Sequence, residues 1–115
     1  MKSGISFEQG EIVFVPFPFA NLSATKKRPV LILSNTDYNK RLSDFVSCGI
    51  TSNINDANYS VLIESKDLSR GFLPRSSRIK VNTIFTLEKA IVVKTFGKVK
   101  GYVMEKVKEE FYKLF

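Results

Sequence analysis

Short apolar segments separated by turn residues fill most of this chain of 115 residues, and this pattern is what most restricts its fold. Segments of this length, rich in β-branched and aromatic residues, are typical of strands. We expect strands over residues 11–18, 29–35, 45–52, 59–65, 78–82, 83–87 and 91–100. Residues 19–28 and 66–77 are expected to be loops, and 36–44 a loop or one helical turn.

The last segment of the chain changes period. Val103, Val107, Phe111 and Leu114 recur at helical spacing with Glu and Lys between them, which predicts an amphipathic helix over residues 102–115. Many short strands followed by one helix favour a mainly β fold, a small and highly curved antiparallel barrel. Because this length is usual for one domain, we expect residues 1–115 to form a single domain.

Proline marks two of the expected strands. Pro16 and Pro18 restrict the end of the first strand to a sheet edge or a bend, because proline cannot donate a ladder hydrogen bond. Pro29 opens the second strand and biases the residue before it toward extended backbone. The three residues that precede it are the cations Lys26, Lys27 and Arg28. We expect the arginine side chain to be held where this strand begins.

The composition restricts the compartment and the class of partner. A net charge of +7 favours a polyanionic partner, such as nucleic acid, an anionic membrane surface or an acidic protein, but it also fits an ordinary basic protein. The single cysteine, Cys48, excludes an internal disulfide and lies in an apolar run, as expected of a buried thiol in a reducing compartment. No segment is long and apolar enough to span a bilayer, and no secretory signal opens the chain, so we expect a cytoplasmic protein without a membrane role.

The excess positive charge is concentrated in three zones, residues 26–41, 65–80 and 81–100. If the barrel brings these zones together, they form one basic groove. If it does not, they are ordinary solvated loops. The sequence leaves both interpretations open.

Several motifs occur in an order found in one known family. They are "GEIVFVPFPFANLS" (10–23), "KKRPVLILSN" (26–35), "GITSN" (49–53) and "GFLPRSSRIKVNTIFTLEK" (71–89), followed by the closing helix. With these motifs the chain resembles the MazF/PemK-type toxins, the ribonuclease components of toxin–antitoxin systems. The resemblance covers nearly the whole chain.

The resemblance implies an SH3-like barrel of the MazF/PemK/CcdB type that forms a homodimer. It implies a sequence-selective endoribonuclease that cleaves single-stranded RNA without a metal or another cofactor. It also implies inhibition by an acidic antitoxin whose flexible segment lies over the RNA groove. The family's critical arginine and threonine correspond to Arg28, before the proline, and Thr51, in the "ITS" motif.

The chemistry of these two residues suits RNA cleavage in which the 2′-hydroxyl attacks the adjacent phosphorus. The planar guanidinium of Arg28 can grip two phosphate oxygens and stabilise the extra negative charge. The hydroxyl of Thr51 can donate to the same phosphate. The alternatives are a solvated loop cation for Arg28 and, for Thr51, a strand hydroxyl bonded to a backbone carbonyl.

The sequence assigns no general base. The chain has no histidine, and arginine is too basic for this task. Some family members carry an acidic residue in the loop before the arginine, and this loop has none, so Glu11 and Asp37 are candidates from sequence proximity alone. Asn82 stands where the family often has an aspartate, and no role is assigned to it.

Further residues are expected to contact the RNA. Backbone phosphates are predicted to bind Lys26, Lys27, Arg75, Arg78 and Lys80. Ser52 and Asn53 are expected either to line the groove or to cap a turn. Phe19, Phe72 and Tyr38 are candidates for stacking on unpaired bases, with core or dimer contacts as the alternative. Specificity is expected to lie in loops 19–27 and 53–58.

The alternative function is that of a non-catalytic protein on the same barrel, which binds nucleic acid or inhibits DNA gyrase. Asn82 and the missing acid before Arg28 favour this alternative. A gyrase inhibitor would not depend on Arg28 or Thr51, and it would need exposed residues on the terminal helix.

Overall fold

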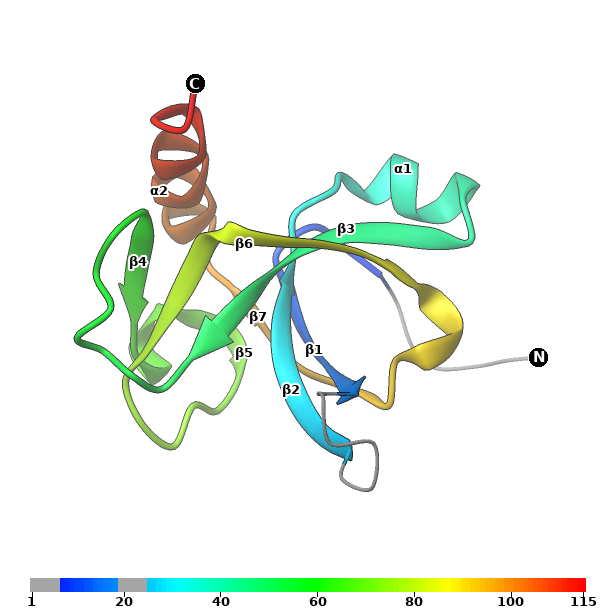
Figure 1. Cartoon of the computed structure of the whole chain (residues 1–115), viewed down its shortest axis with the longest axis horizontal. Coiled ribbons are helices and arrows are strands. Elements are labelled where there is room, and N and C mark those ends of the chain that lie inside the picture. The colour runs from blue at the N-terminus through cyan, green and yellow to red at the C-terminus, as the bar shows by residue number, and fades with distance from the viewer. Residues whose placement is uncertain (1–6, 19–24) are drawn as a thin grey trace.

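The computed structural model describes residues 7–18 and 25–115. In these residues one antiparallel sheet of seven strands curls into a half-barrel, with α1 and α2 on different sides of it (Figure 1). The elements are β1 (Glu11–Pro18), β2 (Thr25–Ile32), α1 (Thr36–Arg41), β3 (Asp44–Thr51), β4 (Ser60–Ile63), the 3-10 turn η1 (Ser65–Asp67), β5 (Leu68–Gly71), β6 (Ser77–Glu88), the 3-10 turn η2 (Lys89–Ile91), β7 (Lys94–Val99) and α2 (Gly101–Tyr112). The predicted mainly β, highly curved antiparallel fold with a C-terminal helix is confirmed.

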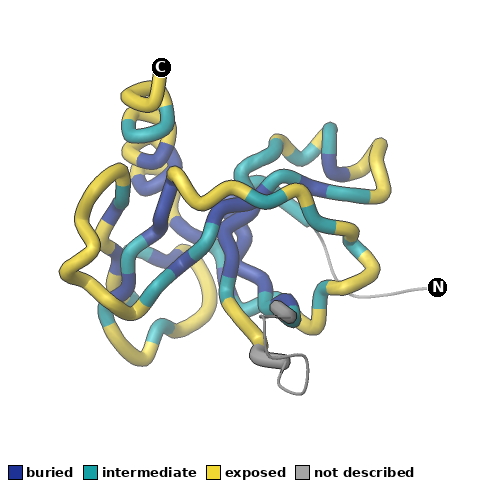
Figure 2. Tube along the Cα trace, viewed as in Figure 1, coloured by how far each residue is buried: buried dark blue, intermediate teal, exposed yellow. Residues whose placement is uncertain are grey.

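Strands β1 and β2 lie inside the sheet, whose order is β4-β6-β3-β2-β1-β7-β5. Ile12 and Leu31 belong to one hydrophobic cluster, and Val13 and Val30 belong to a second cluster. Figure 2 shows the resulting buried stretch along the central strands. Because successive side chains of a strand point to opposite faces, two buried faces require the unbroken apolar runs seen in the sequence.

Helix α2 closes one side of the half-barrel against β4 and β6. Its buried residues are Val103, Met104 and Val107, and Phe111 is partly buried. The predicted apolar stripe is therefore present, but Leu114 lies beyond the helix and is exposed. No helix in the described residues is long and apolar enough to cross a membrane.

Several element boundaries differ from the prediction, and three of the differences are large. Strand β2 begins at Thr25, so Arg28 lies inside a strand and not where a strand begins. The two short strands expected over 78–87 are one strand, β6, whose pairing with β3 shifts register between Cys48 and Gly49. Residues 68–71, expected to be loop, form β5, which pairs with β7.

Among the described residues, the prolines of β1 lie where this strand is paired with one neighbouring strand instead of two. Pro16 and Pro18 pair with Lys27 and Thr25 of β2. On the other side, β7 pairs with β1 only as far as Phe14. The end of β1 is therefore a local edge, as the prolines predicted.

Candidate functional site

The ladder between β2 and β3 stops at Pro29, and this stop opens the site. Val30 pairs with Gly49, and Leu31 pairs with Cys48. The N–H of Leu33 donates to Val46 of β3, so in this alternating ladder the odd-numbered residues of β2 direct their N–H groups to β3. Residue 29 has the same orientation, but proline has no N–H, so it cannot donate the next hydrogen bond of this ladder. If the pairing of β2 with β3 continued for two more residues beyond Val30 and Gly49, Arg28 would lie opposite Thr51.

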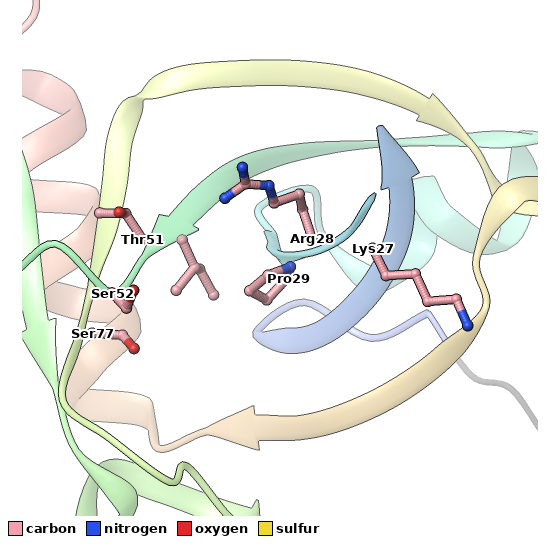
Figure 3. Close-up of a pocket in the computed structure, with 7 residues that line it drawn as sticks. Lys27, Arg28, Pro29, Thr51, Ser52 and Ser77 are labelled. Carbon is pink, nitrogen blue, oxygen red and sulfur yellow. The ribbon is translucent and has the colours of Figure 1, made fainter. Parts of the chain in front are cut away.

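A cavity of about 310 Å³ lies where the two strands separate. It is lined by Lys27, Arg28, Pro29, Ile50, Thr51, Ser52 and Ser77. Figure 3 shows the three hydroxyl residues on one wall and Arg28 and Pro29 on the other. The guanidinium of Arg28 extends toward the hydroxyl wall, whereas Lys27 extends the opposite way, as neighbours in a strand do. We call this space the cation cavity.

The hydroxyl of Thr51 is oriented by its own loop. Its oxygen accepts a hydrogen bond from the backbone N–H of Asn53 at 3.1 Å. Because the N–H occupies one acceptor position, the hydroxyl proton can be donated elsewhere. The Oδ1 of Asn53 in turn accepts from the N–H of Asn55 at 3.2 Å. Asn53 therefore caps a turn and positions Thr51, while Ser52 lines the cavity.

Two of the predicted phosphate ligands hold the loop between β3 and β4. The Nε of Arg78 donates to the carbonyl of Ile54 at 2.6 Å. The ammonium of Lys80 donates to the Asp56 carboxylate at 2.8 Å and to the carbonyl of Asn58 at 2.9 Å, and only 9% of this lysine is exposed. Neither cation lines the cation cavity, and both fasten this loop to β6.

A second cavity, of about 230 Å³, adjoins the first. The two share Pro29, Ile50, Ser52 and Ser77, and Arg75 lines the second. Sequence reasoning missed Ser77, because residues 66–77 were expected to be loop. It opens β6 and is buried like Ile79, so the strand's alternation begins one residue before the predicted start.

The three basic zones contribute to one region of the surface. Lys27 and Arg28 line the first cavity, and Arg75 lines the second. From the third zone, the ammonium of Lys94 lies 5.4 Å from the ring centroid of Phe14, which also lines the second cavity. Residues of two zones therefore line the adjoining cavities, and Lys94 of the third zone contacts a lining residue of the second cavity, while the single basic groove stays a prediction.

The other predicted contacts lie outside both cavities or outside the described residues. Phe19 is not among the described residues, and neither is the side chain of Lys26. The hydroxyl of Tyr38 donates to Asp44 at 2.9 Å. Phe72 is 68% exposed and lines neither cavity.

Neither candidate base lies at the site. Glu11 is buried, and its carboxylate accepts hydrogen bonds from the Arg70 guanidinium at 2.9 Å and from the backbone N–H of Glu8 at 2.6 Å. Asp37 forms an ion pair with Arg41 within α1. None of the described side chains that line the two cavities is a carboxylate. The described site can therefore bind a phosphate and stabilise negative charge, and it offers no carboxylate base.

A curled antiparallel half-barrel, closed by a C-terminal helix, is the fold of the MazF-like proteins. The family assignment follows from the sequence as well. Residues 8–115 match the model of the family described as "PemK-like, MazF-like toxin of type II toxin-antitoxin system", and the chain belongs to that family. In a sequence comparison, no protein with a curated description matches the chain.

Solved structures share this fold at low identity. One is an endoribonuclease in complex with its cognate antitoxin from a Mycobacterial species, with a TM-score of 0.75 and 20% identity over 92% of this chain and 91% of that chain. A second is the MazE–MazF complex (Form-III) from Deinococcus radiodurans, with a TM-score of 0.75 and 18% identity over 93% of this chain and 94% of that chain. A third is the Mycobacterium tuberculosis toxin MazF-mt6, with a TM-score of 0.73 and 16% identity over 90% of this chain and 93% of that chain.

Proposed function

We propose that this MazF-like toxin is an endoribonuclease that cleaves single-stranded RNA at selected sequences by attack of the 2′-hydroxyl, without a metal ion. The observation that carries the proposal is the cation cavity, in which the guanidinium of Arg28 faces the wall that holds the Thr51 hydroxyl. Family membership and the endoribonuclease among the similar structures support it. The positive charge around the cavity suits a phosphate backbone.

In the proposed reaction the 2′-oxygen bonds to the adjacent phosphorus, and the bond from phosphorus to the 5′-oxygen breaks. The 2′-hydroxyl proton leaves to a base, the 5′-oxygen takes up a proton, and the products end in a cyclic phosphate and a 5′-hydroxyl. Arg28 binds two phosphoryl oxygens as their negative charge increases, and Thr51 donates a hydrogen bond to the same group. Lys27 attracts the phosphate backbone.

The test is cleavage of a long unstructured RNA in EDTA by the wild type and by Arg28→Ala. Removal of a positioned donor to the transition state is expected to lower kcat by about 10²–10³-fold. The matched control is Arg41→Ala, because Arg41 lies on α1 in an exposed ion pair with Asp37. It should cleave at the wild-type rate, and both variants should melt like the wild type.

Analysis of the new ends tests the chemistry. A 2′,3′-cyclic phosphate and a 5′-hydroxyl are expected, and a 2′-deoxynucleotide 5′ to the scissile phosphate should abolish cleavage. Equal rates for wild type and Arg28→Ala would refute the role of Arg28. A 3′-hydroxyl with a 5′-phosphate would refute attack by the 2′-hydroxyl.

The proposal includes a homodimer and an acidic antitoxin partner. Similar structures contain an endoribonuclease with its cognate antitoxin and a MazE–MazF pair, which supports the antitoxin. The net charge of +7 suits an acidic segment. Light scattering at micromolar concentration should give twice the 13.0 kDa mass of the chain, and a monomer mass would contradict the dimer.

Gyrase inhibition is the second candidate, because the C-terminal end has the exposed side chains that it requires. Tyr112 and Phe115 are both strongly exposed, and Phe115 is 89% exposed. If the protein inhibits gyrase, the Arg28→Ala variant should remain toxic, and the protein should bind gyrase in a pull-down. Loss of toxicity together with loss of cleavage would exclude it.

A further inference from the structure

The second cavity is largely apolar and lies directly beside the cation cavity. Its apolar walls include Phe14, Phe96, Leu73 and Pro74, and its border with the cation cavity is formed by the four shared residues. Its volume is about 230 Å³. We call it the apolar slot.

Phe96 is directed into the slot by a β-bulge. In the pairing of β1 with β7, Ile12 lies opposite Gly97 and Val13 lies opposite Thr95, so Phe96 is the extra residue of β7. A bulge turns a side chain away from the regular alternation and often occurs beside functional sites. The rings of Phe96 and Phe14 meet edge to face, with centroids 5.1 Å apart and planes at 82°. The aromatic wall is therefore fixed before any ligand binds.

Two glycines let β5 approach this bulge. Gly71 has a φ of +91°, and a Cβ there would lie 2.5 Å from the carbonyl oxygen of Phe96. A Cβ on Gly97 would lie 2.6 Å from the carbonyl oxygen of Arg70. Since only glycine fits at both positions, the backbone behind Phe96 is closely packed and cannot shift to fill the slot.

The part of the lining that Leu73 contributes is also anchored. The hydroxyl of Ser65 donates to the carbonyl of Leu73 at 2.9 Å and accepts from the N–H of Leu73 at 2.6 Å. Leu73 is partly buried against the main core, whereas its neighbour Phe72 is exposed. The slot is thus an apolar recess with an anchored lining, and it lies beside a cavity that is lined by the cationic side chains of Lys27 and Arg28.

We propose that the apolar slot binds one unstacked nucleobase of the RNA, that of a nucleotide beside the phosphate held by Arg28 and Thr51. The inference rests on the proposed ribonuclease function and adds a specificity site to it. Two facts carry it: the slot shares four lining residues with the cation cavity, and its lining is mostly aromatic and aliphatic, with Arg75 as its one cation among the described residues. RNA that is read as a single strand offers bases for aromatic stacking beside its phosphates.

The experiment combines protein variants with RNA variants. After the cleavage site has been mapped with the wild type, the same RNA is made abasic in turn at the nucleotide on each side of the scissile phosphate. At one of the two positions the wild type should lose about 5- to 150-fold in kcat/KM, the range for one base–aromatic stack. Phe96→Leu and Leu73→Ala should have a lower kcat/KM than the wild type on intact RNA. For these two variants, removal of that base should lower kcat/KM only slightly further. Leu62→Ala, on β4 and outside the slot, is the matched control and should keep the wild-type abasic penalty.

The two proposals fail in different ways. If both slot variants keep the full abasic penalty while the wild type cleaves normally, the slot does not hold a base and the ribonuclease stands. The inference is also overturned if the wild type cleaves both abasic RNAs as fast as the intact RNA. If the wild type does not cleave, the ribonuclease proposal fails. Fluorescence anisotropy with a short unstructured RNA and the same RNA made abasic at every position then decides on the slot, because the slot variants should show a smaller loss of affinity on removal of the bases than the wild type does. Thermal melting of Leu73→Ala and Phe96→Leu verifies that both variants are folded.

Discussion

Salt dependence should separate the cations that bind RNA from those that hold the protein together. Lys27 is exposed and lines the cation cavity. Lys80 carries the same charge, but it is buried, and its ammonium is bonded to Asp56 and Asn58. Both lysines are predicted phosphate ligands from the sequence alone. The structure leads us to expect phosphate binding by Lys27 and none by Lys80.

The magnitudes follow from counterion release. Removing one cation that binds a phosphate of single-stranded RNA should lower the slope of log affinity against log salt by about 0.7. Over a fivefold rise in salt, the affinity of Lys27→Ala should therefore fall about threefold less than that of the wild type. Lys80→Met should keep the wild-type slope. It should instead lower the free energy of unfolding by about 1–3 kcal/mol, because it removes two hydrogen bonds to a charged group while the half-exposed Asp56 regains water.

The assay is fluorescence anisotropy with an RNA that carries a 2′-deoxynucleotide at the cleavage site, measured from low to high salt. Urea denaturation of the same proteins gives the free energies of unfolding. The reasoning is refuted if Lys80→Met lowers the slope as much as Lys27→Ala does, since a buried, bonded ammonium would then be reaching phosphate. An unchanged slope for Lys27→Ala would equally remove Lys27 from the RNA interface.

Two further predictions concern stability. Gly71→Ala should destabilise the fold by more than about 1–3 kcal/mol, since it combines a left-handed backbone with a backbone contact of 2.5 Å. Gly101→Ala, at the start of α2 with nothing within 4 Å, should be neutral or stabilising, and urea denaturation that ranks the pair in reverse would contradict the packing at the bulge. The ion pair with Lys98 lowers the pKa of the Glu8 carboxyl, so its stabilisation is present above about pH 4.5 and lost as the pH falls through the lower folded-state pKa. Glu8→Gln should reduce the difference in stability between pH 6 and pH 3, and an unchanged difference would show that this pair contributes nothing.

Local patterns allowed much of the fold to be predicted. The helical period of Val103 and Val107 predicted α2, and the β-branched runs predicted β1, β3 and β4. These signals work because the residues bury one face or both faces of an element, which sets the period of the apolar positions. The MazF/PemK resemblance supplied the topology that the patterns could not.

Long-range contacts explain what the sequence did not reveal. The start of β2 at Thr25 depends on pairing with the end of β1, and polar residues such as Lys27 carry no strand signal of their own. Strand β5 is short and has one buried residue, Leu68, so it has no detectable alternation. The apolar slot depends on a bulge at Phe96, and a bulge is a property of the register between two strands, not of either one.

The prediction of the site residues was limited in the same way, because contacts between distant segments decide which side chains face the cavity. Arg28 and Thr51 were predicted from motifs, and their relation across the cavity follows from a register that ends at Pro29. By contrast, Arg78 and Lys80 lie in a basic zone of the sequence, but their side chains bind backbone and carboxylate groups of the loop between β3 and β4. Net charge along a sequence cannot distinguish a cation that faces solvent from one that is internally bonded.

One missing hydrogen-bond donor thus accounts for the position of the site. Without an N–H at residue 29, the central ladder of the sheet ends two residues before Arg28 and Thr51 would face each other as a regular pair. The sheet stays intact because β1 still pairs with β2 and β6 still pairs with β3 on their other sides. The separation therefore leaves a cavity between two strands that are each held by another neighbour. The backbone at Arg28 and at Thr51 is therefore held by strand pairing, which favours the pre-organised stabilisation of charge that the proposed reaction requires.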